Sequence, residues 1–231
     1  MNRLFISDLH LSEERPHTTA AFLAFLAEKA IACEQLYILG DFFDAWIGDD
    51  DDRPLAAEIA NALRKISDHG VQVFFQHGNR DFLLGDTYAA RCGMQLLPEL
   101  CVIEHACRRY LLAHGDQFCT QDAAYQQFRE LVRNPEWQRD FLAKPLTERR
   151  AIAAQLRAKS KEANSIKAED IMDVTPSEIE TALVANQCGS LIHGHTHRPA
   201  RHTLVLPDGS TAERIVLSDW EESYRFFQLA Q

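Results

Sequence analysis

Five short polar motifs hold the residues best suited to chemistry in this sequence. In chain order they read SDLH, GDFFD, HGNRD, HGD and HGHTH, and each one follows an apolar run. They supply carboxylates, an amide and imidazoles, but no thiolate. The side chains in them that could bind a metal ion are Asp8, His10, Asp41, Asn79, His114, His195 and His197.

This donor set predicts a particular kind of metal site. Oxygen and imidazole ligands suit Mn²⁺, Fe²⁺ or Zn²⁺ and argue against a structural zinc site built from cysteines. Seven donors are too many for one tetrahedral ion and fit two ions, which requires a bridging carboxylate; Asp41 lies in the middle of the set. Two divalent ions ~3.5–4 Å apart are the usual arrangement for attack of an activated water at phosphorus.

The elements that must position these residues are typical of an α/β fold. Short apolar runs alternate with amphipathic stretches, and the carboxyl ends of strands in such sheets face a common crevice. A turn alone could explain any single motif, because Gly-Asp is common in turns; five repeats favour a shared site. We expect strands over 4–7, 35–39, 71–76, 109–113, 190–192 and 214–217, and helices over 18–32 and 55–68.

Residues 121–168 differ from the rest of the chain. They contain no glycine, and Tyr125, Phe128 and Val132 recur at helical spacing. Ordinary core packing would explain that apolar face. However, residues 139–167 carry eight Lys/Arg and three Asp/Glu, a net +5 within a total of −10, which leaves −15 for the remainder. A basic, aromatic helical insertion on an acidic body is a candidate binding element.

Composition excludes several classes of protein. With 46% hydrophobic and 25% charged residues, the chain is a normal globular protein rather than a disordered or fibrous one. The net charge of −10 argues against a nucleic-acid binder, although bound metal ions would still allow an anionic substrate. We expect no signal peptide and no membrane-spanning helix. The six scattered cysteines indicate reduced thiols of a cytoplasmic protein.

Together the five motifs resemble those of the calcineurin-like metallophosphoesterase superfamily, in the same order along the chain. The resemblance implies an α/β fold with a two-sheet β-sandwich core flanked by helices. It implies one domain over residues 1–231, with a helical cap inserted at 121–168. It assigns one metal ion to Asp8, His10, Asp41 and His197, and the other to Asp41, Asn79, His114 and His195.

Arg80 departs from the superfamily pattern, which usually has histidine after the Gly-Asn pair. A guanidinium, with a pKa above ~12, cannot act as a general acid at neutral pH. It can neutralise phosphate charge through paired hydrogen bonds. Arg80 therefore favours cleavage of a P–O–P linkage, whose leaving group needs no proton. The alternative is a local salt bridge from Arg80 to Asp81 or Asp44.

Longer stretches, among them YILGDFFDAWIGDDD and SKEANSIKAEDIMDV, resemble the diphosphatase family that acts on UDP-2,3-diacylglucosamine in lipid A biosynthesis. The resemblance implies two Mn²⁺ ions and hydrolysis to UMP and 2,3-diacylglucosamine 1-phosphate (lipid X), with water attacking the phosphorus on the uridine side. It implies catalytic roles for Asp41, Asn79, Arg80 and His195. It assigns substrate contacts to Asn79, Arg80, Asp122, Ser160, Asn164, Lys167 and His195, although Ser160 and Asn164 could instead form a solvated helix face.

A lipid substrate would also explain the insertion. An acyl chamber would be lined by Trp46, Phe82, Tyr125, Phe128, Phe141, Ile152 and Leu156, although core packing explains these residues nearly as well. The basic charges of 139–167 would dock on anionic lipid at ~1 kcal/mol each. We therefore expect peripheral contact with the cytoplasmic face of the inner membrane, and neither nucleic acid nor an obligate protein partner.

Two alternatives to that function stay open. The same dimetal site could act on a soluble nucleotide or a phosphoprotein, or the fold could serve as a non-catalytic scaffold. The acidic run Asp49–Asp52 has no ligand spacing, so we expect it to be a solvated loop.

Overall fold

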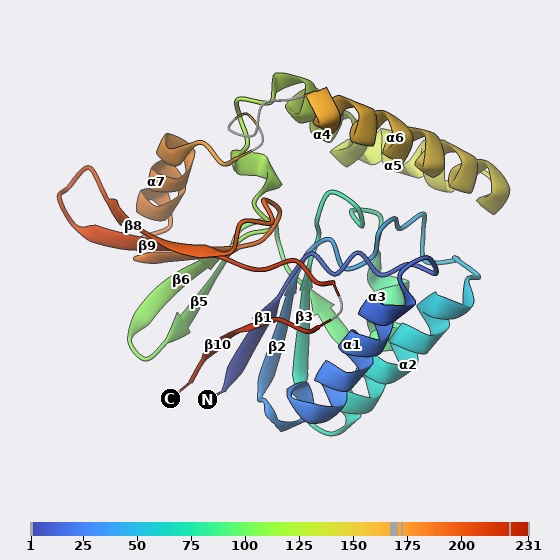
Figure 1. Cartoon of the computed structure of the whole chain (residues 1–231), viewed down its shortest axis with the longest axis horizontal. Coiled ribbons are helices and arrows are strands. Elements are labelled where there is room, and N and C mark those ends of the chain that lie inside the picture. The colour runs from blue at the N-terminus through green and yellow to red at the C-terminus, as the bar shows by residue number, and fades with distance from the viewer. Residues whose placement is uncertain (1, 167–170, 172, 222, 231) are drawn as a thin grey trace.

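The computed structural model describes residues 2–166, 171, 173–221 and 223–230 of the chain. Two five-stranded sheets pack face to face in it (Figure 1). The first sheet contains, in spatial order, β10 (Phe227–Leu229), β1 (Arg3–Ile6), β2 (Gln35–Leu39), β3 (Gln72–Gln76) and β4 (Met94–Leu96). The second contains β5 (Cys101–His105), β6 (Arg108–Leu112), β7 (Ser190–His193), β9 (Thr211–Val216) and β8 (Ala200–Val205).

Helices cover the outer face of each sheet (Figure 1). Side chains alternate along β1: Leu4 and Ile6 join the core under the helices, while Phe5 faces the second sheet. Between the sheets Phe5 stacks on Tyr37 with ring centroids 4.9 Å apart. The first sheet is covered by α1 (Pro16–Glu28), α2 (Pro54–Asp68) and α3 (Asp86–Cys92), and the second by α7 (Pro176–Ala185). The predicted fold class is confirmed.

Parallel pairing brings the ends of distant strands to one edge. Strands β1, β2 and β3 are parallel neighbours, and so are β6 and β7. All five polar motifs begin at the carboxyl ends of these strands or directly after them. The two sheets thus deliver the motifs to one cleft.

Most predicted elements are present, with shifted ends. The six expected strands are β1, β2, β3, β6, β7 and β9. The helix expected over 18–32 is shorter: α1 ends at Glu28, and a 3₁₀ turn (Ala30–Ala32) follows it. Sequence reasoning missed β4, β5, β8, β10, α3 and α7. Strands β4 and β10 are only three residues long, too short to show a period, and β8 is an exposed edge strand without alternation.

The predicted insertion forms three helices above the strand ends (Figure 1), and apolar side chains from two of them pack against the core of the first sheet. They are α4 (Ala123–Arg133), α5 (Pro135–Leu142) and α6 (Leu146–Ile166). Local sequence starts two of them: Asp122 caps α4 by accepting from Tyr125 N, and Asn134 caps α5 ahead of a proline. None of the described helices combines the length and the apolar composition needed to cross a membrane.

Candidate metal centre and substrate cavity

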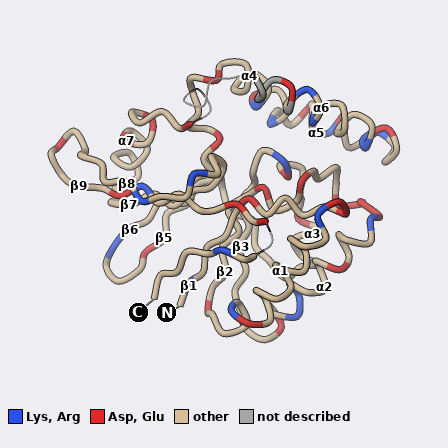
Figure 2. The backbone as a smooth tube through the Cα atoms, viewed as in Figure 1, with Lys and Arg blue, Asp and Glu red and all other residues tan. Residues whose placement is uncertain are grey.

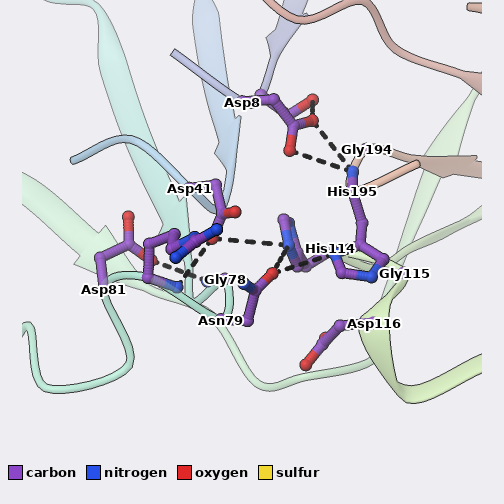
Figure 3. A network of polar contacts seen from close by, with 12 residues as sticks. Asp8, Asp41, Gly78, Asn79, Asp81, His114, Gly115, Asp116, Gly194 and His195 are labelled. Atoms are coloured by element: carbon purple, nitrogen blue, oxygen red, sulfur yellow. Dashed lines mark hydrogen bonds and ion pairs between the residues drawn. The ribbon is translucent and has the colours of Figure 1, made fainter. Parts of the chain in front are cut away.

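The candidate metal ligands meet where the strands end (Figure 3). Asp8 follows β1, Asp41 follows β2 and Asn79 follows β3, while His114 and His195 come from the second sheet. Backbone hydrogen bonds join the first two loops: Asp8 N donates to Gly40 O at 3.1 Å, and His10 N donates to Asp41 O at 2.9 Å. These two loops belong to the first sheet. Because His114 and His195 come from the second sheet, both sheets form the cleft.

The backbone is strained at these positions. A left-handed conformation costs a residue other than glycine roughly 1–3 kcal/mol and persists only where surrounding contacts hold it, often at functional sites. Five candidate ligands adopt it: Asp8 (φ 57°), His10 (50°), Asp41 (51°), His195 (69°) and His197 (52°).

One group of donors comprises Asp8, His10 and His197, whose ligand atoms lie within 4.8 Å of one another. The Nε2 atoms of the two histidines are 3.2 Å apart, and His197 Nε2 lies 3.4 Å from Asp8 Oδ1. His10 Nδ1 is buried without a hydrogen-bond partner among the described residues. Burial lowers the pKa of His10 to about 3, so its ring is in the neutral, metal-binding form at pH 7. This donor set fits a divalent cation.

A second group surrounds the amide of Asn79 (Figure 3). Asn79 Oδ1 lies 3.0 Å from His114 Nε2 and 2.9 Å from His195 Nδ1. The other ring nitrogen of His114, Nδ1, lies 2.8 Å from Leu39 O and donates to it, which leaves Nε2 as the lone-pair donor toward the cleft. The second group therefore also combines one oxygen donor with two imidazoles, which suits a second divalent cation.

Asp41 lies between the two groups. Its Oδ1 is 3.6 Å from His114 Nε2, and its Oδ2 is 3.9 Å from His10 Nδ1. Burial raises the pKa of Asp41 to about 7; the nearby His114 opposes this shift, and the carboxylates of Asp81 and Asp8 add to it. Each oxygen of Asp41 lies toward one donor group, and the carboxylate is costly to ionise without a nearby cation. Asp41 therefore fits a bridge between two cations.

Gly78 and Asp81 hold that carboxylate in place. A Cβ on Gly78 would lie 2.2 Å from Asp41 Oδ1, so only glycine allows this approach. Asp81 is fully buried and accepts from Gly78 N at 2.8 Å and from Phe42 N at 2.7 Å. It thereby ties the loop after β3 to the loop after β2.

Sequence reasoning missed two carboxylates behind the ligands. Asp219 Oδ2 lies 3.5 Å from His197 Nδ1 and can orient that ring. Asp116 is buried two residues after His114 and accepts from Tyr125 Oη at 2.6 Å and from Arg129 Nε at 2.9 Å, which ties α4 to the cleft. Asp116 belongs to a motif of which we considered only the histidine. Asp219 follows β9, a parallel neighbour of β7, so the strand-end rule could have pointed to it.

A cavity of about 270 Å³ lies beside the metal centre, under the cap helices. Asn79 and Arg80 line it on the cleft side. Arg80 Nε is buried with no hydrogen-bond partner among the described residues. The alternative salt bridges of Arg80 are absent from the described part of the chain: Asp81 binds backbone N–H groups, and Asp44 pairs with Arg157. The guanidinium is therefore available to a ligand.

The remaining predicted residues divide into three groups. Ser160 lines the cavity, as do Trp46, Phe82, Tyr125, Phe128, Phe141 and Leu156, whereas Ile152 packs against the core instead. Asp122 caps α4 and is not among the residues that line the cavity. Lys167 and the side chain of Asn164 lie outside the described residues.

The prediction of a solvated loop at Asp49–Asp52 is only partly right: Asp50 and Asp52 are exposed, but Asp51 is buried and all four carboxylates have partners. Asp49 accepts from Gly85 N at 2.8 Å and from Tyr88 N at 2.9 Å. The other three carboxylates pair with arginines: Asp50 with Arg149, Asp51 with Arg53, and Asp52 with Arg150. Two of these arginines come from the cap about a hundred residues away. Figure 2 shows the run of acidic positions in the loop before α2 and the basic positions along the cap helices.

The chain is similar to a protein family, to named proteins and to solved structures. A family model described as calcineurin-like phosphoesterase matches residues 1–199. A protein of Cellvibrio japonicus named UDP-2,3-diacylglucosamine hydrolase is 56% identical, covering 95% of this chain and 91% of its own length. One of the same name from Serratia proteamaculans is 53% identical with the same coverage. Among solved structures, vacuolar protein sorting 29 from Cryptosporidium parvum aligns with a TM-score of 0.48 and 15% identity, over 97% of this chain and 77% of that one.

Proposed function

The chain belongs to the calcineurin-like phosphoesterase family, and on that basis we propose that it hydrolyses the diphosphate bond of UDP-2,3-diacylglucosamine, a step of lipid A biosynthesis. The observation that carries the proposal is that Asn79 and Arg80 lie between the metal cleft and the cavity. Both residues adjoin the dimetal cleft, and both line the apolar cavity under the cap. A diphosphate in the cleft can therefore extend acyl chains into the cavity.

The seven ligand candidates would hold two divalent cations, for which we propose Mn²⁺. Such ions supply a nucleophilic water and neutralise phosphoryl oxygens. Arg80 would bind the diphosphate through its unpartnered Nε and the rest of its fork. Because it stays charged, it can stabilise the departing 2,3-diacylglucosamine 1-phosphate without giving up a proton. Asn79 and His195 would orient the phosphoryl group undergoing attack, leaving UMP as the second product.

The cavity supports the lipid part of the substrate. It is lined largely by aromatic and aliphatic side chains. Each buried methylene of an acyl chain contributes ~0.8 kcal/mol. We propose that the segment 121–168 is a cap inserted in a single domain and that Ser160, Asp122, Asn164 and Lys167 contact the sugar and phosphate. A soluble nucleotide would leave the apolar surface without a ligand.

The test compares an acylated with a non-acylated substrate. Metal-free protein is supplied with Mn²⁺, Mg²⁺, Co²⁺ or Zn²⁺ and assayed on UDP-2,3-diacylglucosamine in mixed micelles and on UDP-N-acetylglucosamine in solution. We expect Mn²⁺-dependent release of UMP from the acylated substrate only. In ¹⁸O-labelled water the label should enter UMP, which reports attack on the uridine side. Equal rates on the two substrates would refute lipid specificity, and activity in the metal-free protein would refute the dimetal chemistry.

We also propose that the cap contacts the cytoplasmic face of the inner membrane peripherally. Leu131 on α4 and Leu142 on α5 are 54% and 39% exposed. Three arginines of α6 form ion pairs with aspartates of the body and are less available to lipid headgroups. The proposal therefore depends more on the exposed leucines than the sequence indicated.

Sedimentation with anionic phospholipid vesicles tests this contact. Leu131→Asp should reduce the bound fraction. Val205→Asp is the matched control, because Val205 is 68% exposed on β8, away from the cap. Equal loss of binding by both variants would contradict docking through the cap.

A further inference from the structure

Helix α6 rests on the acidic loop through a buried arginine. Arg149 is only 2% exposed; its Nε donates to Lys144 O at 2.9 Å and its Nη1 donates to Ile47 O at 2.7 Å. Its Nη1 also donates to Asp50 Oδ1 at 2.8 Å, and its Nη2 donates to Asp50 Oδ2. A buried guanidinium is tolerated only where its N–H groups are paired. The contact therefore specifies one position of the helix on the loop.

The loop is shaped for this close approach at Gly48. The φ of Gly48 is +132°, in the region that favours glycine. A Cβ there would lie 2.4 Å from Arg149 Nη1 and 2.8 Å from Leu142 Cδ2. A side chain at Gly48 would force the Arg149 or Leu142 side chain, or the loop itself, to shift.

The face of α6 that carries Arg149 is also the face that lines the cavity. Ala153, Leu156 and Ser160 follow Arg149 by four, seven and eleven residues, which places all four on one side of the helix. Ala153, Leu156 and Ser160 line the cavity, whereas Arg149 does not. The Arg149 contact, together with the Arg150–Asp52 and Arg157–Asp44 pairs, thus helps to set which side chains of α6 reach the cavity one to three turns farther along.

We propose that Arg149 and Asp50 are a positioning pair that makes the enzyme selective for long acyl chains. The pair touches neither the metal ligands nor the cavity and acts through α6, whose apolar face it holds in place. The inference rests on the proposed function, because it concerns the acyl part of the same substrate. Each buried methylene adds a similar factor to affinity, so a displaced α6 should weaken long-chain binding more than short-chain binding.

The experiment measures kcat and KM for Arg149→Met and Asp50→Asn with myristoyl and hexanoyl diacyl substrates. We expect KM for the myristoyl substrate to rise about tenfold, within the range that small displacements of substrate-positioning groups produce. KM for the hexanoyl substrate and kcat for both should change less than about twofold, and the bound metal should stay at the wild-type level. Because the two side chains act as one unit, the double variant should be no worse than Arg149→Met.

Arg201→Met is the matched control. Arg201 on β8 forms a bidentate pair with Glu213 (2.7 and 2.9 Å), and neither residue lines the cavity. Its removal should leave both KM values unchanged. If Arg149→Met folds poorly, Asp50→Asn still decides the question, since the side chain of Asp50 is 62% exposed.

An unaltered chain-length preference in both variants would overturn the inference, and so would an equal loss on both chain lengths or a loss of bound metal. Failure of the proposed function gives a different result: the wild-type protein would then hydrolyse neither diacyl substrate.

Discussion

Two clusters of aspartates, one in the metal cleft and one in the acidic loop, differ in how their charge is balanced. In the metal cleft, Asp8 and Asp41 are buried and pair only with histidines among the residues that the structure describes. In the acidic loop, Asp50 and Asp52 pair with cap arginines, and Asp51 with Arg53 of its own loop.

The difference separates a binding site from a structural contact. Burial, reinforced by the nearby carboxylates of Asp81 and Asp8, raises the pKa of Asp41 to about 7, although the hydrogen bond with His197 and the charges of neighbouring histidines lower the pKa of Asp8. In the acidic loop, the hydrogen bond from Arg149 lowers the pKa of Asp50. Asp41 is therefore costly to ionise without a bound cation, while the carboxylates of the acidic loop already have arginine partners from α6 and from Arg53.

The largest effect should come from removing Asp41, the carboxylate that we propose bridges the two ions. Asp41→Asn should reduce hydrolysis on the order of 10³-fold or more, with loss of bound metal measured by elemental analysis. Asp50→Asn removes the same group from the acidic loop and should keep its full metal content. Metal loss in Asp50→Asn equal to that in Asp41→Asn would erase the distinction between the two clusters.

Arginines on the two sides should differ almost as strongly. Arg80→Ala removes a guanidinium whose Nε has no hydrogen-bond partner among the described residues, and it should lower kcat by about 10²–10³-fold while the bound metal stays near the wild-type level. Arg150→Ala removes a paired, partly exposed guanidinium and should leave kcat nearly unchanged. Metal loss in Arg80→Ala would make Arg80 a structural residue.

A smaller effect is expected behind the ligands. Asp219→Asn weakens the orientation of His197 and should lower metal affinity about 10–100-fold. Titration of the metal-free protein with Mn²⁺, followed by calorimetry, measures this affinity directly. Wild-type affinity in the variant would mean that Asp219 has no role in holding His197.

The smallest effect is an opposite pH dependence of stability in the metal-free protein. The pKa of Asp41 is raised on folding from 3.8 to about 7, so wild-type stability from this group is lost as pH rises over that range. The advantage of Asp41→Asn should therefore grow between those values. The pKa of Asp50 is lowered, so wild type should be more stable than Asp50→Asn near neutrality and lose that advantage in acid. Urea unfolding at several pH values measures both, and parallel profiles would contradict the comparison.

The motifs of the metal centre were predictable from sequence because each ligand lies within a few residues of a strand end. Asp8, Asp41 and Asn79 follow parallel neighbouring strands, so local spacing together with the strand-end rule brings them together. Asp219 follows β9, a parallel neighbour of β7, and fits the same rule, although no polar motif drew attention to it. Ile152 shares its helical periodicity with Leu156 yet packs against the core instead of the cavity, which periodicity alone does not predict.

The sequence by itself determined the type of chemistry: the ligand atoms, their order on the strands, the arginine in place of histidine, and the helical nature of the insertion. Only the tertiary structure decided the state of each charge. An aspartate in a loop reads as unpaired until a residue about a hundred positions away contacts it, as Arg149 contacts Asp50. Ion pairing and burial depend on distances in space, which local sequence patterns do not encode.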